Sequence, residues 1–83
     1  LESSLRLTGY DPIEGGIIGG TCTLTDGENT FQETDSYGDF WFKNLKVGTY
    51  DLTIAAPGFQ TLHLNGLSTE KDVNLGDIPM DKA

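Results

Sequence analysis

The side chains that could perform chemistry are few and far apart in this 83-residue chain. Nucleophilic catalysis needs a nucleophile, a base and a group that orients the base. The single cysteine, Cys22, shares a predicted strand face with Leu24, which favours a small core side chain over a nucleophile. The single histidine, His63, lies between two leucines and is expected on a strand surface. Nothing in the sequence brings these side chains together, so we predict neither a catalytic site nor a cofactor site in this domain.

Two carboxylates, Asp35 and Asp39, flank a predicted turn and are the weak candidates for a metal site. Across the turn they could converge for acid–base work, or bind calcium together with backbone carbonyls. A plainer role for Asp35 is to accept hydrogen bonds from the amides of the turn. Residues 26–29 are a still weaker calcium candidate, because calcium takes roughly six to eight oxygen ligands. We therefore expect no metal site, with calcium at Asp35 and Asp39 as the alternative.

The glycine-rich residues 15–20 have the composition of a phosphate-binding loop but not its context. Such loops need a lysine and a following helix, and the sequence offers neither. We predict a flexible connection, held at the edge of the core by Ile13, Ile17 and Ile18.

Trp41 is the side chain most suggestive of binding. Its neighbours Phe40 and Phe42 point to one face of a predicted strand, so the indole must point to the other face. It could pack under a loop or under the Ile17–Ile18 segment, it could form the centre of a protein interface, or it could stack on a sugar. We take Trp41, Ile17 and Ile18 as the interface candidates.

The elements that would position these residues are β-strands. In residues 38–54 large apolar residues recur at about every second position on both sides of Gly48, which predicts two adjacent strands with one buried face. No helical period appears anywhere in the sequence. Strands are predicted at residues 4–8, 21–25, 30–34, 39–45, 49–55, 59–64 and 71–80, with a loop at 66–70. This spacing predicts an all-β, seven-stranded antiparallel β-sandwich.

The expected core consists of the apolar residues that face inward from these strands. A chain of this length buries only about 60% of the surface that its unfolded form exposes, so we expect no deep cavity. The predicted core residues are Leu5, Leu7, Cys22, Leu24, Phe31, Phe40, Phe42, Leu45, Tyr50, Leu52, Ile54, Phe59, Val73 and Leu75.

Composition limits the partners. Thirteen acidic and five basic residues give a net charge of −8, and such a surface repels nucleic acid and anionic lipid. No apolar stretch is long enough to predict membrane insertion. One cysteine excludes an internal disulfide and slightly favours the cytoplasm over an extracellular location. We expect one domain, residues 1–83, monomeric in isolation and cut from a longer chain.

Residues 34–59 contain a long motif of regularly spaced residues. It consists of Thr34, Asp35, Gly38, Phe40, Phe42, Asn44, Leu45, Gly48, Tyr50, Leu52, Ile54, Gly58 and Phe59. This motif resembles the signature of carboxypeptidase regulatory-like domains, which are transthyretin-like, Cna B-type β-sandwiches. The resemblance extends over roughly residues 5–80. It implies the sandwich fold and a role as a stalk, spacer, accessory or docking module, and it says little about chemistry.

Residues 37–42 and the single cysteine show a narrower resemblance. They are similar to the domain fused behind ferredoxin-like iron–sulphur subunits of molybdenum oxidoreductases of the pyrogallol–phloroglucinol transhydroxylase type. This resemblance implies that any cofactors belong to other domains, because the chain has no cluster-ligating set of cysteines. We expect a non-catalytic accessory module whose partners are other domains or subunits of its parent protein. The alternative is a carbohydrate-binding or cell-surface stalk module.

Overall fold

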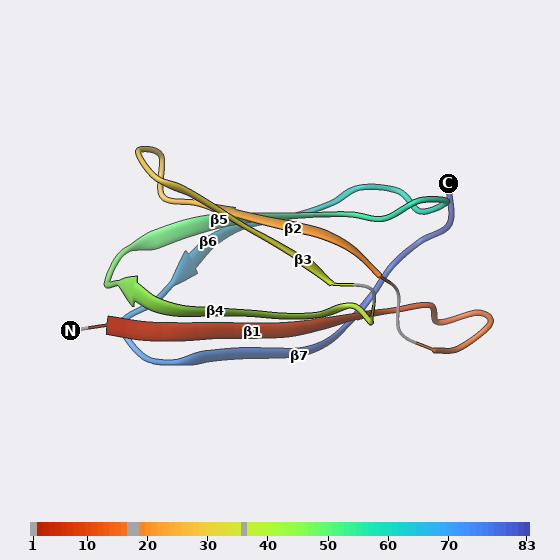
Figure 1. Ribbon diagram of the computed structural model, residues 1–83, viewed down its shortest axis with the longest axis horizontal. Helices are drawn as coiled ribbons and strands as arrows, with labels where there is room; N and C mark the ends of the chain where they lie inside the picture. The colour runs from red at the N-terminus through yellow and green to blue at the C-terminus, as the bar shows by residue number, and fades with distance from the viewer. Residues whose placement is uncertain (1, 17–18, 36) are drawn as a thin grey trace.

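Two packed β-sheets form the part of the chain that the computed structural model describes, residues 2–16, 19–35 and 37–83 (Figure 1). Three strands form one sheet, in the order β4-β1-β7, and four form the other, in the order β3-β2-β5-β6. This arrangement confirms the predicted all-β sandwich. The strands are β1 (Glu2–Tyr10), β2 (Gly20–Thr25), β3 (Thr30–Asp35), β4 (Asp39–Lys46), β5 (Thr49–Ala55), β6 (Leu62–Ser68) and β7 (Val73–Pro79).

One strand pairing departs from the predicted antiparallel arrangement, because β1 and β7 run parallel. In the same sheet β4 is antiparallel to β1, and in the facing sheet β5 is antiparallel to β6. The connections from β4 to β5 and from β6 to β7 each reverse the chain as it crosses between the sheets (Figure 1). These reversals return β7 to the direction of β1.

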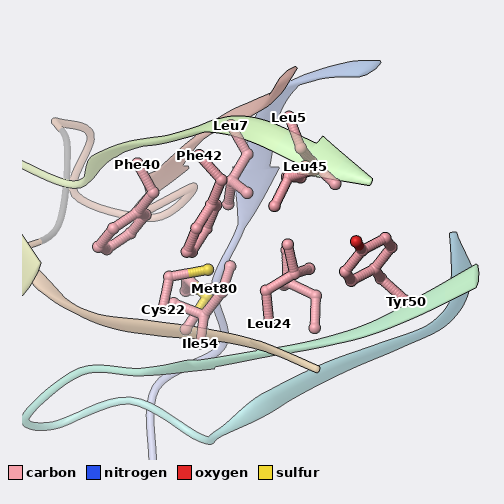
Figure 2. Packing of buried hydrophobic residues seen from close by; sticks show 11 residues of the cluster. Leu5, Leu7, Cys22, Leu24, Phe40, Phe42, Leu45, Tyr50, Ile54 and Met80 are labelled. Carbon is pink, nitrogen blue, oxygen red and sulfur yellow. The ribbon is translucent and has the colours of Figure 1, made fainter. Parts of the chain in front are cut away.

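The core lies between the sheets and is filled by alternate side chains of the strands (Figure 2). Phe40 is 1% exposed and Phe42 is 3% exposed, so both rings occupy the interior as predicted. Met80 is also buried, although it was not among the predicted core residues. The buried cluster is Leu5, Leu7, Cys22, Leu24, Phe40, Phe42, Leu45, Tyr50, Leu52, Ile54 and Met80.

Phe31 is the predicted core residue that the structure contradicts, since its side chain is 39% exposed. Its register partner on β2 is Leu24, which is fully buried, so the two side chains share a face of the sheet. The difference is that β3 is an edge strand, and the tip of the β2–β3 hairpin turns away from the facing sheet (Figure 1). Phe31 therefore lacks a covering layer. Phe59, Val73 and Leu75 are only partly buried against the core.

A β-bulge in β4 explains why its buried residues do not alternate strictly. Leu5 pairs with Phe42 and Ser3 pairs with Leu45, which leaves two residues of β4 opposite one residue of β1. Asn44 takes up the extra length in the left-handed region, with φ of 59°. A bulge of this kind shifts the alternation by one residue, so both Phe42 and Leu45 face inward.

The predicted loop at residues 66–70 is wrong in its first part, because β6 continues to Ser68. Gly66 suggested an interruption, but it forms a second bulge within the strand, with φ of 72°. Its N–H group donates a hydrogen bond to Asp51 Oδ1 on β5 at 3.1 Å. Glycine accommodates this backbone conformation without a steric penalty, and the strand therefore resumes.

Thr69 joins the two inter-sheet connections at one end of the sandwich. Its buried hydroxyl accepts a hydrogen bond from the Gly48 N–H at 2.9 Å and lies within donating distance of the Lys46 carbonyl, also at 2.9 Å. The Ser3 hydroxyl donates to the Thr69 carbonyl at 2.8 Å. These bonds tie the β4–β5 connection to the start of the β6–β7 connection.

Replacing Phe42 with alanine should lower the free energy of unfolding by about 3–5 kcal/mol, because it leaves a cavity in the dry interior. Domains of this size have total stabilities of only about 5–15 kcal/mol, so the variant should be poorly folded. Phe31→Ala is the matched control and should cost much less, since Phe31 is half covered. Urea unfolding monitored by circular dichroism measures both, and equal losses would show that the inward assignment of Phe42 is wrong.

Candidate functional site: the outer face around Trp41

Trp41 lies on the outer face of the three-stranded sheet and is 47% exposed. It projects outward because its neighbours Phe40 and Phe42 fill the core. Its register partner on β1 is Arg6, which is exposed on the same face. The alternation of β4 thus positions the indole where the sequence analysis predicted it.

Two cations lie over the indole ring. The Lys43 ammonium is 4.1 Å from the ring centroid, and the Arg6 guanidinium carbon is 5.2 Å from it. Contacts of this type contribute about 0.5–1 kcal/mol at exposed positions. They limit the rotation of Trp41, so the indole forms a defined feature of the surface.

Asp39 fixes the position of Arg6. Its carboxylate accepts two hydrogen bonds, from Arg6 Nε at 3.2 Å and from Arg6 Nη2 at 2.9 Å. The hydrogen bond from Arg6 is the main cause that lowers the pKa of the Asp39 carboxyl, and the positive charge of Arg6 lowers it further. Asp39 in return raises the pKa of Arg6. Asp39, Arg6, Trp41 and Lys43 form one ordered surface, which we call the Trp41 face.

Two depressions open on the surface of the described residues. One, of about 290 Å³, adjoins Trp41, and another, of about 250 Å³, lies beside the β2–β3 hairpin. The first is lined by Glu2, Ser3, Ser4, Trp41, Lys43, Asn44 and Asp72. The second is lined by Glu2, Asp26, Asn29, Phe31, Asn44, Lys46 and Tyr50.

The calcium candidates are engaged elsewhere or lie outside the described side chains. Asp39 is bound to Arg6, and the side chain of Asp35 is not among those described. Asp26 accepts hydrogen bonds from the backbone N–H groups of Glu28 at 2.9 Å and Asn29 at 2.6 Å, which stabilises its turn. Within the described ranges, no group of three or more His, Cys, Asp and Glu residues could hold a metal ion.

The single cysteine and the single histidine lie on opposite faces of the same sheet. Cys22 is fully buried in the core, whereas His63 is exposed and its Nδ1 lies 3.1 Å from the Thr53 hydroxyl. Burial raises the pKa of the Cys22 thiol to about 12, so the thiolate that a nucleophile requires is disfavoured. The two side chains therefore cannot act together.

Asp11 is a buried carboxylate that the sequence analysis did not single out. It accepts hydrogen bonds from the N–H groups of Ile13 at 2.9 Å and Glu14 at 3.2 Å, and Lys82 approaches it at 3.7 Å. The hydrogen bond from Ile13 is the main cause that lowers the Asp11 pKa. The Asp-Pro pair is a known turn signal, and the role of Asp11 is to shape the loop after β1. Ile13 is 77% exposed, so the prediction that it holds this segment at the edge of the core is wrong. Ile17 and Ile18 lie outside the described residues.

No helix in the described part of the chain has the length and apolar character needed to cross a membrane.

The Cys22 thiol should not react with a disulfide reagent near neutral pH until the protein unfolds.

The raised pKa of Cys22 also predicts how stability depends on pH. A thiol whose pKa is higher in the folded state than in the unfolded state stabilises the fold fully below the unfolded pKa, and this stabilisation is lost as the pH rises above it. Stability should therefore fall as the pH rises from 9.0 towards about 12. The free energy of unfolding is measured against pH for the wild type and for Cys22→Ala, and the difference between the two curves gives the contribution of Cys22. Identical curves for the two proteins would contradict the prediction.

Millimolar calcium should leave the melting temperature unchanged, because Arg6 already neutralises Asp39 and holds both of its carboxylate oxygens. Differential scanning calorimetry with calcium, and with magnesium as the control, measures this. A rise with calcium alone that disappears in Asp39→Asn would instead establish the alternative that the sequence left open.

Solved structures with the same fold come from proteins of different kinds. The group B streptococcus pilus 2b backbone protein matches with a TM-score of 0.67 and 14% identity, over 99% of this chain and 42% of that chain. A candidate carbohydrate binding protein from Bacteroides uniformis ATCC 8492 matches with a TM-score of 0.73 and 13% identity, over 95% and 41%. A type II cohesin–X-dockerin complex from Acetivibrio cellulolyticus matches with a TM-score of 0.74 and 20% identity, over 94% and 56%.

At these identities the structural matches establish the fold alone, and the chain spans about half the length of the matched chains or less. They do not bear on the predicted likeness to iron–sulphur subunits, which stays a prediction. No curated protein matches the sequence. The carboxypeptidase regulatory-like domain matches residues 9–80, which include β2 to β7 but only the last two residues of β1. This chain therefore belongs to the carboxypeptidase regulatory-like domain family.

Proposed function

We propose that this domain is a non-catalytic accessory module that packs against or docks a larger protein, with the Trp41 face as the contact. The observation that carries the proposal is the Trp41 indole, which is 47% exposed on an otherwise polar face of the sheet. Lys43 and Arg6 hold the ring in place, and Arg6 is itself ion-paired with Asp39. Tryptophan and arginine are enriched at the energetic centres of protein interfaces. Holding them in position before binding reduces the entropy lost on association.

The interior supports this proposal because it leaves no room for chemistry. Phe40, Phe42 and Tyr50 fill the space between the sheets, and Cys22 and His63 face opposite ways. A surface that binds by shape and charge needs no cavity. The proposal therefore assigns function to the outer faces of the sandwich and not to its centre.

The shape of the sandwich supports a spacing role as well. The two ends of the chain lie at opposite ends of the long axis (Figure 1), and the fold extends 39 Å along that axis. Inserted in a longer polypeptide, such as the small subunit of an oxidoreductase, it would hold its neighbours apart by about its own length. A stalk module would use the same geometry.

Carbohydrate binding is the weaker alternative for the Trp41 face. A sugar stacks on the flat face of an aromatic ring, and here Lys43 and Arg6 already lie over the indole. Sugar platforms usually use several coplanar aromatic rings. Tyr10 is four positions along β1 from Arg6, a distance of about 13 Å, and does not adjoin Trp41.

A photo-crosslinking amino acid at position 41 tests the docking proposal in the natively expressed polypeptide. We expect crosslinks to another domain or subunit, and far fewer from position 32. Gln32 is the matched control because it is exposed on the outer face of the opposite sheet.

Equal or absent crosslinking at both positions would overturn the Trp41 face as a docking surface. Binding on a glycan array that is lost in Trp41→Ala would favour the carbohydrate alternative instead.

A further inference from the structure

The sandwich is open along one of its two sides. On one side β3 and β4 are in contact, whereas on the other side β6 and β7 make almost no contact with each other. The inward-facing residues of β1, β2, β4 and β5 are almost fully buried, but those of β6 and β7 are all partly exposed. We call this strip of side chains the β6–β7 seam. It consists of Leu62, Leu64, Leu67, Val73, Leu75 and Ile78.

Both strands that border the seam are the last in their sheets. β6 is hydrogen-bonded to β5 and β7 is hydrogen-bonded to β1, so alternate backbone groups of each strand point away from the fold. Such groups form a template on which another extended chain can pair. The seam therefore offers backbone hydrogen bonds and apolar contacts side by side.

Among the edge strands, β6 alone has no charged residue and no proline to prevent strand pairing. Charged residues, proline and bulges normally protect a sheet edge. β3 carries Glu33, β4 carries Lys43, and β7 carries Asp77 and Pro79. β6, with the sequence LHLNGLS, has no Asp, Glu, Lys, Arg or Pro, and only the bulge at Gly66 interrupts it. Its regular part, residues 62–65, is open to pairing.

The charges around the seam determine which chain would pair there. Four carboxylates and one lysine lie between residues 59 and 81, namely Glu70, Asp72, Asp77 and Asp81 with Lys71. Of the other basic residues, Arg6, Lys43 and Lys46 are on β1 and β4. Lys82 bridges Phe59 just before β6, but its ammonium group is paired with Glu14 at 3.0 Å. A second copy, with a net charge of −8, would be repelled, whereas a basic segment would be attracted.

We propose that the β6 edge binds an extended segment of another polypeptide, in which apolar side chains alternate with polar ones and basic residues flank them. The segment adds a strand beside β6, places its apolar side chains in the seam over Leu62 and Leu64, and brings its basic residues to the surrounding carboxylates. This inference rests on the proposed docking function but uses a surface separate from the Trp41 face. The two can therefore fail independently.

The probe that tests it is a synthetic peptide, acetyl-Lys-Val-Thr-Val-Thr-Val-Lys-amide, titrated into the 15N-labelled 83-residue chain. We expect chemical-shift changes concentrated at β6 and at the seam residues of β7, with slower hydrogen exchange at β6 amides. The affinity should fall as salt is added, because the flanking charges contribute to it. Changes centred on β3, or none at millimolar peptide, would overturn the proposal.

Matched controls separate strand pairing from general attraction. A peptide with Glu in place of both Lys residues, and one with N-methyl groups on the amides that would pair, should each bind at least about tenfold more weakly. Leu64→Lys places an ammonium group in the seam and should weaken binding similarly, whereas Gln32→Lys makes the same charge addition on β3 and should not. Equal binding of the N-methylated peptide would contradict strand pairing, and this control needs no variant of the protein. Dimerisation through β6 in sedimentation experiments would assign the edge to a second copy instead.

Discussion

Exclusion of water from the layer between the two sheets is the interaction on which the rest of this structure depends. Alternate residues of the central strands place Phe40, Phe42, Leu52 and Tyr50 in that layer, where they are at most 3% exposed. In a domain this small the apolar layer supplies most of the stabilisation that offsets chain entropy. Among the described residues, this layer is filled by apolar side chains.

The same alternation that fills the core also creates the surface features. Phe40 and Phe42 can be buried only if Trp41 faces outward, and the antiparallel register with β1 then places Arg6 beside it. The β6–β7 seam has the opposite origin, since its side chains face inward but lie where no neighbouring strand covers them. The Trp41 face and the seam thus offer two kinds of contact, one through a held aromatic ring and one through an unpaired strand.

The fold was predictable because its signals are local. Residues 38–54 carry an alternation that the bulge at Asn44 shifts but does not disrupt, and the family motif in residues 34–59 is long. Gly66 misled the interpretation because a glycine at a turn and a glycine at a bulge have the same sequence signature. Phe31 misled it because alternation gives the face of a strand but not the presence of a layer opposite that face.

The sequence by itself determined the class of fold, the burial of Phe40, Phe42 and Tyr50, and the outward direction of Trp41. Each of these follows from the period of side chains along a single strand. Only the tertiary structure decided which strand edges stay unpaired, that β7 runs parallel to β1, and that Lys43 and Arg6 lie over the indole. These features depend on contacts between segments that are distant in the chain, and the side-chain pattern along one strand does not predict which strand will lie beside it.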